Sequence, residues 1–437
     1  MSTHLMPLAL PAVGGSGLGN SGRFRGTAQL YFGVYIGCSM GGMGVVGIAA
    51  RYTNGVGTRE NALTARIRQT IDNKTKPRGA LGRLEDVAAQ ICRIQETVSP
   101  VLAQPTVLVF AADHGLAREP VSAYPREVTA QMAMNILAGG AGINVFARQH
   151  GIDVILVDAG VDWHGDKPLA LVDHWMGPGT ANSLTGDAMT PDQVQRCLDA
   201  GAEVVDQVGP GCTIMGFGEL GIGNTSSASL LMSALAGIPL DECVGPGSGL
   251  AGEGLSRKLD LLHRVRDFHE APDVQLVSPD PTTALARGAL AQEALAMYGG
   301  FEIAQMCGAM LRAYETGRIL MIDGFVATAS YLVAWTINPE IADNAIFCHE
   351  SGEPGHARIL DYLGAVPLLH LGMRLGEGTG CAVAYPVIAS AVAFVNEMAS
   401  FSEAGVSTGE PETAGKPEAT GVPEAAVGSE TAGDEVM

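Results

Sequence analysis

The hydrophobic residues of this chain gather in short runs that are apolar on both faces. Five runs have the length of a β-strand, and each precedes a loop and a segment of helical periodicity: 106–113, 153–160, 212–219, 318–324 and 345–351. Helical periodicity is clearest over 128–149, 190–208 and 225–237, the first and last with a threonine near the expected N-cap. Buried strands that alternate with helices are typical of a parallel sheet covered on both sides. The pattern therefore predicts a doubly wound α/β fold.

Polar residues stand at or just after the end of each expected strand. Ligands of such sheets bind outside the carboxyl edge, so we expect the functional site at this edge. The residues concerned are Asp113-His114-Gly115, Asp158-Ala159-Gly160, Gly218-Glu219, Asp323-Gly324 and His349-Glu350-Ser351.

The two chain ends depart from this pattern. No charged residue occurs between Arg25 and Arg51, and this glycine-rich apolar run is long enough for a membrane span. A loosely ordered extension, translated upstream sequence and a membrane anchor all remain open for it. From Ser402 to Met437 a mixture of Glu, Thr, Gly, Pro and Ala has no apolar period, which predicts a disordered acidic tail.

Composition limits the partners and the compartment. The formal charge of −20 disfavours a nucleic-acid partner, although one local cationic pocket for a phosphate stays possible. The eight cysteines are scattered without a CxxC pair, which argues against structural zinc and a disulfide scaffold. Buried thiols of this kind predict a reducing, cytoplasmic environment.

Two glycine-rich segments could hold an anion. Residues 216–229 (GFGELGIGNTSSAS) follow an expected strand and precede a helix, so bare backbone N–H groups could face a phosphate beside a helix N-terminus. The segment is neither a Walker loop nor a dinucleotide fingerprint, and a tight turn without a ligand remains an alternative. A second segment, 244–262, leads to Arg257 and Lys258, where Lys258 could supply a charge to the phosphate or be a solvated helix residue.

A third segment contains a glutamate, Glu377, whose surroundings would suit a catalytic base. Glu377 stands between Gly376 and Gly378, and the apolar flanks should raise the pKa of this carboxyl group by desolvation. A simple turn is the alternative. In residues 110–132, Ser122 and Tyr124 lie in a loop before a helix that contains Gln131. The pair Asp113-His114 in the same stretch is better explained by structural roles than by metal binding, because no other His or Cys shows ligand spacing.

Taken in order, these segments resemble one family, nicotinate-nucleotide:dimethylbenzimidazole phosphoribosyltransferase, a pentosyltransferase of cobalamin biosynthesis. The resemblance covers about 330 of the 437 residues. It runs through IDNKTKPRGALGRLEDVAAQICRIQ, FAADHGLA, VSAYPREVTAQM, GGAGINVFARQ, VDAGVD, GFGELGIGNTSSAS, GPGSGL with Arg257-Lys258, DGFVATAS and HESGEPGHARILDYLGAVPLLHLGMRLGEGTGCAVAYP.

The resemblance assigns roles residue by residue. It implies that Glu377 is the catalytic base. It implies that the nicotinate mononucleotide contacts Glu219, Gly221, Gly223, Asn224, Lys258, Asp323 and Ser351, and that the aromatic base, 5,6-dimethylbenzimidazole, lies near Ser122, Tyr124 and Gln131. The family is typically a homodimer without a metal or redox cofactor.

The resemblance also implies an organisation of the chain. It predicts a Rossmann-like large domain over about 100–345 and a smaller, mainly helical domain from about 59–99 and 346–401, which leaves 1–58 and 402–437 outside the family pattern. Residues 263–283 look longer than their usual counterpart. A catalytically silent nucleotide-binding or membrane-tethered paralogue is the alternative function, but a binding protein has no use for a base such as Glu377.

Overall fold

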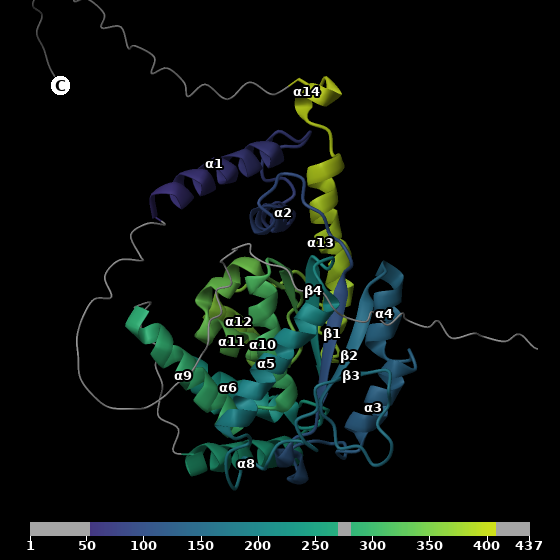
Figure 1. The fold of residues 1–437 in the computed structure, drawn as a ribbon, viewed down its shortest axis with the longest axis vertical. Coiled ribbons are helices and arrows are strands. Elements are labelled where there is room, and N and C mark those ends of the chain that lie inside the picture. Colours follow the sequence, from purple (N-terminus) through teal and green to yellow (C-terminus); the bar gives the residue numbers. More distant parts are fainter. Residues whose placement is uncertain (1–52, 270–280, 408–437) are drawn as a thin grey trace, which may run out of the picture. The chain divides into compact units, whose positions relative to one another are not determined.

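The computed structural model describes residues 53–269 and 281–407 (Figure 1). The apolar run before Arg51, most of the predicted acidic tail and the middle of the long 263–283 connection lie outside the described residues.

The described strands form a single parallel sheet, which confirms the predicted fold class. The strand order is β3-β2-β1-β4-β5-β6, the doubly wound order in which the chain changes direction between β1 and β4. This switch point is where such sheets open a crevice for a ligand. The strands are β1 (Thr106–Ala112), β2 (Asp153–Gly160), β3 (Val172–Asp173), β4 (Ile214–Leu220), β5 (Ile319–Ile322) and β6 (Ala345–Phe347).

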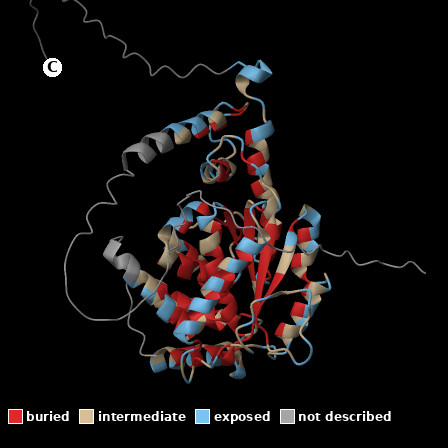
Figure 2. Ribbon diagram, viewed as in Figure 1, coloured by how far each residue is buried: buried red, intermediate tan, exposed pale blue. Residues whose placement is uncertain are grey.

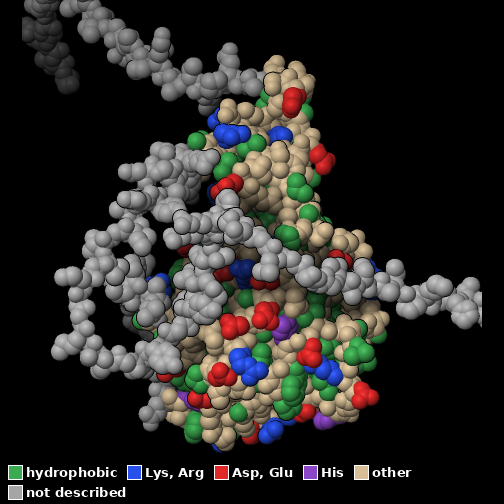
Figure 3. Space-filling view, viewed as in Figure 1, with side chains coloured by type: hydrophobic (Ala, Val, Ile, Leu, Met, Phe, Trp, Pro, Cys, Tyr) green, Lys and Arg blue, Asp and Glu red, His purple; other side chains and the backbone are tan. Residues whose placement is uncertain are grey.

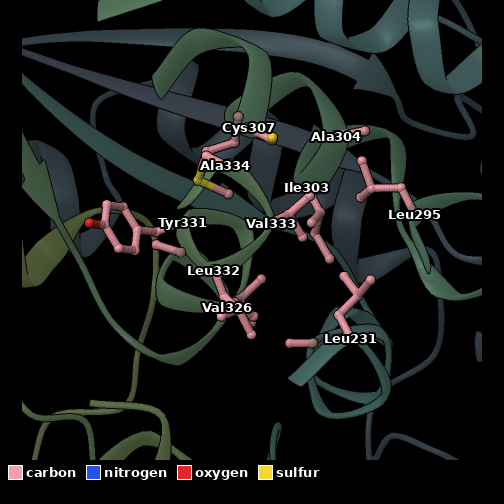
Figure 4. Packing of buried hydrophobic residues seen from close by; sticks show 14 of the residues in the cluster. Leu231, Leu295, Ile303, Ala304, Cys307, Val326, Tyr331, Leu332, Val333 and Ala334 are labelled. Atoms are coloured by element: carbon pink, nitrogen blue, oxygen red, sulfur yellow. The ribbon is translucent and has the colours of Figure 1, made fainter. Parts of the chain in front are cut away.

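Helices cover both faces of the sheet, because alternate side chains of each strand belong to different cores. Leu108 and Phe110 of β1 belong to one cluster, whereas Val107 and Val109 belong to the other. The first cluster includes α5 (Pro191–Val208), α6 (Asn224–Ala236), α9 (Pro281–Tyr298), α10 (Phe301–Glu315) and α11 (Phe325–Ile337). Figure 4 shows how side chains of α6, α9, α10 and α11 pack together in this cluster. The second includes α3 (Val128–Leu137), α4 (Gly142–His150) and α13 (Thr379–Glu397). The buried sheet between these layers is visible in Figure 2.

The remaining described helices are shorter or lie at the periphery. They are α1 (Thr53–Asp72), α2 (Arg83–Ile94), the 3-10 turns η1 (Gly115–Arg118) and η2 (Pro339–Asn344), α7 (Leu240–Cys243), α8 (Glu253–His269), α12 (Pro354–Leu363) and α14 (Phe401–Ala404).

Segments from the two ends of the sequence meet. Lys74 and Ser400 form an isolated antiparallel bridge, and the Nζ of Lys74 donates to the carbonyl of Met398 at 2.6 Å. Helix α13 also packs on α2. The expected division into a large and a small domain stays a prediction. These contacts support a small domain that is built from both ends of the sequence.

Helix α13 is long and apolar enough to cross a membrane by length and composition alone. Half of its most apolar window is buried inside the protein. Its contacts with α2, α4 and β4 explain the apolar composition by packing.

Several predicted boundaries differ from the structure for local reasons. The helix predicted over 128–149 is two helices, because Gly139 adopts a left-handed φ of 78° after α3. Gly223, with φ of 99°, is the N-cap of α6 rather than Thr225, and Glu127 precedes α3 rather than Thr129. The predicted tail begins at Ser402, yet Ser402 belongs to α14, which Ser400 caps by accepting the backbone N–H of Glu403.

Candidate active site

A cleft of about 420 Å³ opens at the carboxyl ends of β4, β5 and β6. The end of β4 and the loops after the three strands contribute Glu219 to Ile222, Gly324 and Ser351 to its lining, and a later segment contributes Arg374 to Glu377. Helix α3 supplies Val128 and Met132. The site therefore forms at the edge that the polar strand ends predict.

Glu377 lies on a tight left-handed turn inside this cleft. Its φ is 62°, and the flanking Gly376 and Gly378 have φ of 85° and 81°. A left-handed conformation is costly for a residue with a Cβ and is found mainly where the surroundings enforce it. The side chain is only 3% exposed, and its Oε2 accepts the backbone N–H of Ile143 at 3.2 Å, at the N-terminus of α4.

Opposing effects act on the Glu377 carboxyl group. Burial raises its pKa and the negative charge of Asp323 adds to the rise, whereas the backbone N–H groups of Ile143 and Gly142 oppose it. The group is thus partly desolvated and still supported in its ionised form by a helix N-terminus. These are properties of a general base.

Asp323 supports the turn that carries Glu377. Its Oδ1 accepts the N–H of Gly380 at 2.6 Å and its Oδ2 accepts the N–H of Gly378 at 3.1 Å. Asp323 is 1% exposed and does not line the cleft. Asp323 therefore positions the turn that carries Glu377, and its direct contact with substrate stays a prediction.

Glu219 stands beside Glu377 at the end of β4. Its backbone carbonyl accepts the N–H of Glu377 at 3.2 Å, and its side chain accepts a hydrogen bond from Asn224. Burial raises the pKa of Glu219 to about 8; the Asn224 hydrogen bond opposes this, and the negative charges of Asp323, Glu302 and Glu377 add to it. These surroundings favour the protonated form of Glu219 more than those of an ordinary glutamate do.

The glycines after β4 allow a close approach of backbone segments. A methyl group at Gly221 would lie 2.4 Å from the carbonyl oxygen of Ala112, so only glycine fits. Behind this turn, His114 Nε2 lies 2.6 Å from Glu302 Oε1, and His114 Nδ1 lies 3.0 Å from the hydroxyl of Ser227. His114 is buried in this network, which agrees with the structural role expected for it.

Lys258 is closed off from the cleft. Its side chain is fully buried, and its Nζ donates to Thr225 Oγ1 at 3.1 Å and to the carbonyl of Gly245 at 3.0 Å. Burial lowers the pKa of Lys258 to about 8, and the charge of Glu353 opposes the shift. Lys258 thus braces the second glycine-rich segment, and its expected phosphate contact requires that segment to move.

Ser351 lines the cleft and is held from behind by His356. The backbone N–H of Ser351 donates to His356 Nδ1 at 2.7 Å, and His356 Nε2 lies 2.9 Å from Thr328 Oγ1. Burial, followed by the neighbouring His349, lowers the pKa of His356 to about 3, so the imidazole is neutral. A neutral ring that accepts at Nδ1 carries its hydrogen on Nε2, which fixes the tautomer.

Of the three residues expected around the aromatic base, only Tyr124 lines the cleft. Tyr124 lines the cleft and is 56% exposed. Ser122 hydrogen-bonds through its hydroxyl to Ser248 Oγ at 2.7 Å and does not line the cleft. Gln131 is exposed on α3, one residue away from the lining residue Met132.

Comparisons with known proteins place this geometry in a family. A phosphoribosyltransferase family profile matches residues 56–406. The nicotinate-nucleotide–dimethylbenzimidazole phosphoribosyltransferases of Cupriavidus necator and Cupriavidus taiwanensis are 49% and 50% identical over 353 and 356 residues, in each case 80% of this chain and 97% of the relative. The crystal structure of CobT from Thermus thermophilus covers 80% of this chain and all of its own, with 40% identity and a TM-score of 0.72. The chain belongs to this phosphoribosyltransferase family.

Membership in the phosphoribosyltransferase family confirms the resemblance read from the sequence. Within the described residues, six of the predicted site residues line the cleft: Glu219, Gly221, Asn224, Ser351, Tyr124 and Glu377. Gly223, Lys258, Asp323, Ser122 and Gln131 lie beside or behind it.

Sequence reasoning assigned no ligand role to several polar residues of the phosphoribosyltransferase cleft, although it named His349 among the polar strand ends. His349, Glu353 and Arg374 all line it. His349 and Glu353 lie close in sequence to Ser351, and Arg374 opens the RLGEGTG segment, so proximity to these motifs was the available signal. Among the described residues, no group of three His, Cys, Asp or Glu side chains is arranged to hold a metal ion.

The surface drawn in Figure 3 interleaves acidic and basic side chains over the described residues. No continuous basic area appears on that face of the described chain.

Proposed function

We propose that this chain transfers the phosphoribosyl group of nicotinate mononucleotide to 5,6-dimethylbenzimidazole, giving α-ribazole 5′-phosphate and nicotinate for the nucleotide loop of cobalamin. The named activity of relatives at about half identity over the whole family region supports this reaction. Those relatives give no support to a silent paralogue.

One observation carries the proposal: Glu377, a buried carboxyl group with a raised pKa, lies in the cleft and accepts a backbone N–H at the N-terminus of α4. The leaving nicotinate departs from ribose C1 with its ring nitrogen unprotonated, so departure requires no general acid. This differs from O-glycoside cleavage, in which the leaving oxygen must receive a proton and a carboxyl pair is used. A cleft with one base is sufficient.

The base acts on the incoming ring. The bare nitrogen of dimethylbenzimidazole attacks C1, and positive charge develops on the ring, which makes the N–H of its other nitrogen acidic. Glu377 takes that proton. Glu219 is a weaker candidate because acidic neighbours and burial raise its pKa, whereas Glu377 accepts a backbone N–H of α4 that supports its ionised form.

The cleft lining supports a position for each of the two substrates. Tyr124, Val128 and Met132 offer an apolar wall for a flat aromatic base. Gly221 and Ser351 lie on loops after β4 and β6, and Asn224 begins α6; the nucleotide would bind beside these residues. Glu377 lies with these residues in the lining, as a base for the incoming ring must.

Two broader properties belong to the same proposal. The seven cysteines of the described chain are buried free thiols, which supports a reducing, cytoplasmic compartment. We also infer a homodimer, and light scattering of the purified protein would measure the assembly directly.

The reaction is tested by incubating purified protein with nicotinate mononucleotide, with and without dimethylbenzimidazole. We expect nicotinate release that depends on the benzimidazole and one equivalent of riboside phosphate per nicotinate. Release without the benzimidazole would indicate a hydrolase, and binding without release would indicate a silent paralogue.

A further inference from the structure

The hydroxyl group of Ser248 joins two loops at the cleft. Ser248 lies in the second glycine-rich segment, and both Ser248 and Tyr124 line the cleft. The Oγ of Ser248 lies 2.7 Å from the Oγ of Ser122 and accepts the backbone N–H of Ala123 at 3.3 Å. The Oγ of Ser122 in turn accepts the backbone N–H of Tyr124 at 3.1 Å. This pair of serines therefore binds two consecutive N–H groups of the loop before α3.

The loop that carries Tyr124 has little else to hold it at this point. Val121 is buried, but residues 123–125 are exposed, and the exposed fraction of Tyr124 is 56%. Packing therefore contributes little to the position of the tyrosine ring. Among the described residues, Ser248 is the one partner from outside this loop that hydrogen-bonds to residues 122–124. The position of Tyr124 thus depends on the hydroxyl group of Ser248.

The turn that carries Ser248 is anchored from its other side. Glu353 Oε2 accepts the backbone N–H of Gly247 at 3.3 Å, and the side chain of Arg374 donates to the carbonyl of Gly247 at 3.3 Å. Gly247 and Gly249 have left-handed φ of 54° and 113°, a backbone path that glycine adopts readily. The turn is therefore a support on which the loop before α3 rests.

This support assigns a role to Ser248. Tyr124, Val128 and Met132 form the apolar wall assigned to the aromatic base under the proposed function, on which this inference rests. Val128 and Met132 belong to α3, whereas Tyr124 precedes the helix and needs a separate support. We propose that Ser248 is a positioning residue for 5,6-dimethylbenzimidazole: its hydroxyl group fixes residues 122–124 and with them the ring of Tyr124. A residue of the glycine-rich segment thereby contributes to the site of the aromatic base.

The same hydrogen bond changes the part that Ser122 plays. The family resemblance places Ser122 near the aromatic base, but Ser122 does not line the cleft, and its hydroxyl group is engaged by Ser248 and by the N–H of Tyr124. Ser122 then acts on the aromatic base through Tyr124 rather than by contact. Because the two serines act as one unit, removal of either hydroxyl group removes the same support. The effects of the two substitutions on affinity should therefore not add.

The experiment compares both substrates on variants of the full-length protein. The variants are Ser248→Ala, Ser122→Ala, the double variant of these two, and Ser248→Thr, which keeps a hydroxyl group. The matched control is Ser256→Ala; Ser256 is an exposed serine of the same glycine-rich segment that donates to the carbonyl of Gly252 at 3.4 Å and does not line the cleft. Calorimetry gives the separate affinities for 5,6-dimethylbenzimidazole and nicotinate mononucleotide, and steady-state kinetics gives kcat and both KM values.

We expect Ser248→Ala to weaken binding of the benzimidazole by about 3- to 10-fold, the usual effect of losing one net hydrogen bond. The KM for the benzimidazole should rise by a similar factor, whereas kcat and the affinity for nicotinate mononucleotide should change less than about twofold. Ser122→Ala should behave like Ser248→Ala, and the double variant should bind within about twofold of the single variants. Ser248→Thr and Ser256→Ala should match the wild type.

Unchanged affinity of Ser248→Ala for the benzimidazole would overturn the proposal. An equal loss of affinity for both substrates would also overturn it, because it would show a general disturbance of the cleft. Additive effects in the double variant would mean that Ser122 acts independently of Ser248, which contradicts the proposal as well. A wild type that binds both substrates without releasing nicotinate would refute the proposed function, and the comparison of affinities would still decide the role of Ser248.

Discussion

Two neighbouring carboxyl groups in the cleft, those of Glu219 and Glu377, have surroundings that affect their protonation differently. Glu219 is desolvated and flanked by other acids, so its pKa rises to about 8. Glu377 is also buried, but the first turn of α4 donates backbone N–H groups to it. The surroundings of Glu219 therefore favour its protonated form, whereas those of Glu377 also support the ionised form that the proposed base requires.

We predict that Glu377→Gln lowers turnover by roughly 10²–10⁴, because general-base catalysis contributes about that factor. Nucleotide affinity should hardly change, since the substitution is nearly isosteric. Steady-state kinetics and calorimetry on Glu377→Gln measure both, with Glu397→Gln, an exposed residue at the end of α13, as control. Wild-type turnover in Glu377→Gln would remove this residue from the mechanism.

The affinity for the nucleotide should fall above a pH of about 8. Ionisation of Glu219, whose pKa is raised to about 8, then places a negative charge beside an anionic substrate. Loss of the proton from Lys258, whose pKa is lowered to about 8, acts in the same direction. We expect Glu219→Gln to reduce the rise of KM between about pH 7 and 9 without abolishing it. An unchanged KM profile would show that Glu219 does not titrate there.

How far single residues could be predicted from the sequence depends on what marks them. Glu377 is marked by its glycine neighbours, and Glu219 and Ser351 by their place at strand ends. Nothing local marks His356, whose importance comes from a neutral ring that accepts the N–H of Ser351. Nor does the sequence reveal that Lys258 is closed off behind a loop.

At the scale of elements, the strand pattern predicted the sheet well because each main strand is buried on both faces. The strand β3, two residues long, has too little apolar sequence to be recognised. The break between α3 and α4 depends on the left-handed backbone of Gly139, and helical periodicity in the sequence does not reveal this conformation. The turn over 376–378 is the element on which the site depends most.

We predict that Gly376→Ala disables this turn. The residue has φ of 85°, and a methyl group would lie 2.2 Å from Glu219 Oε1. Backbone strain should lower the free energy of unfolding by about 1–3 kcal/mol, and displacement of Glu219 and Glu377 should lower turnover at least about tenfold.

Gly364→Ala is the matched control for that substitution. Gly364 also has a left-handed φ, of 62°, but nothing lies within 4 Å of the added methyl group. It should lose comparable stability in denaturant titration and retain turnover. Equal turnover in the two variants would show that the clash at Gly376 is harmless.

At the scale of the whole molecule, the doubly wound sheet brings distant parts of the sequence to one edge. The loops after β4, β5 and β6 and the segment before α13 converge there, although more than 150 residues separate Glu219 from Glu377. The sequence predicted this edge because parallel strands share a direction. The cleft shape and the burial of Lys258 follow from helix packing, which no local pattern encodes.

The stereochemistry of the product tests the central claim most directly. Glu377 can take the benzimidazole proton only if that ring is bound while nicotinate still occupies C1, and the two rings cannot share one face of the sugar. Attack then comes from the side opposite the leaving ring, without a covalent enzyme intermediate. Proton NMR of the anomeric position should show an α-riboside from the β-nucleotide; a β-riboside would mean two successive inversions and would contradict direct displacement assisted by a single base.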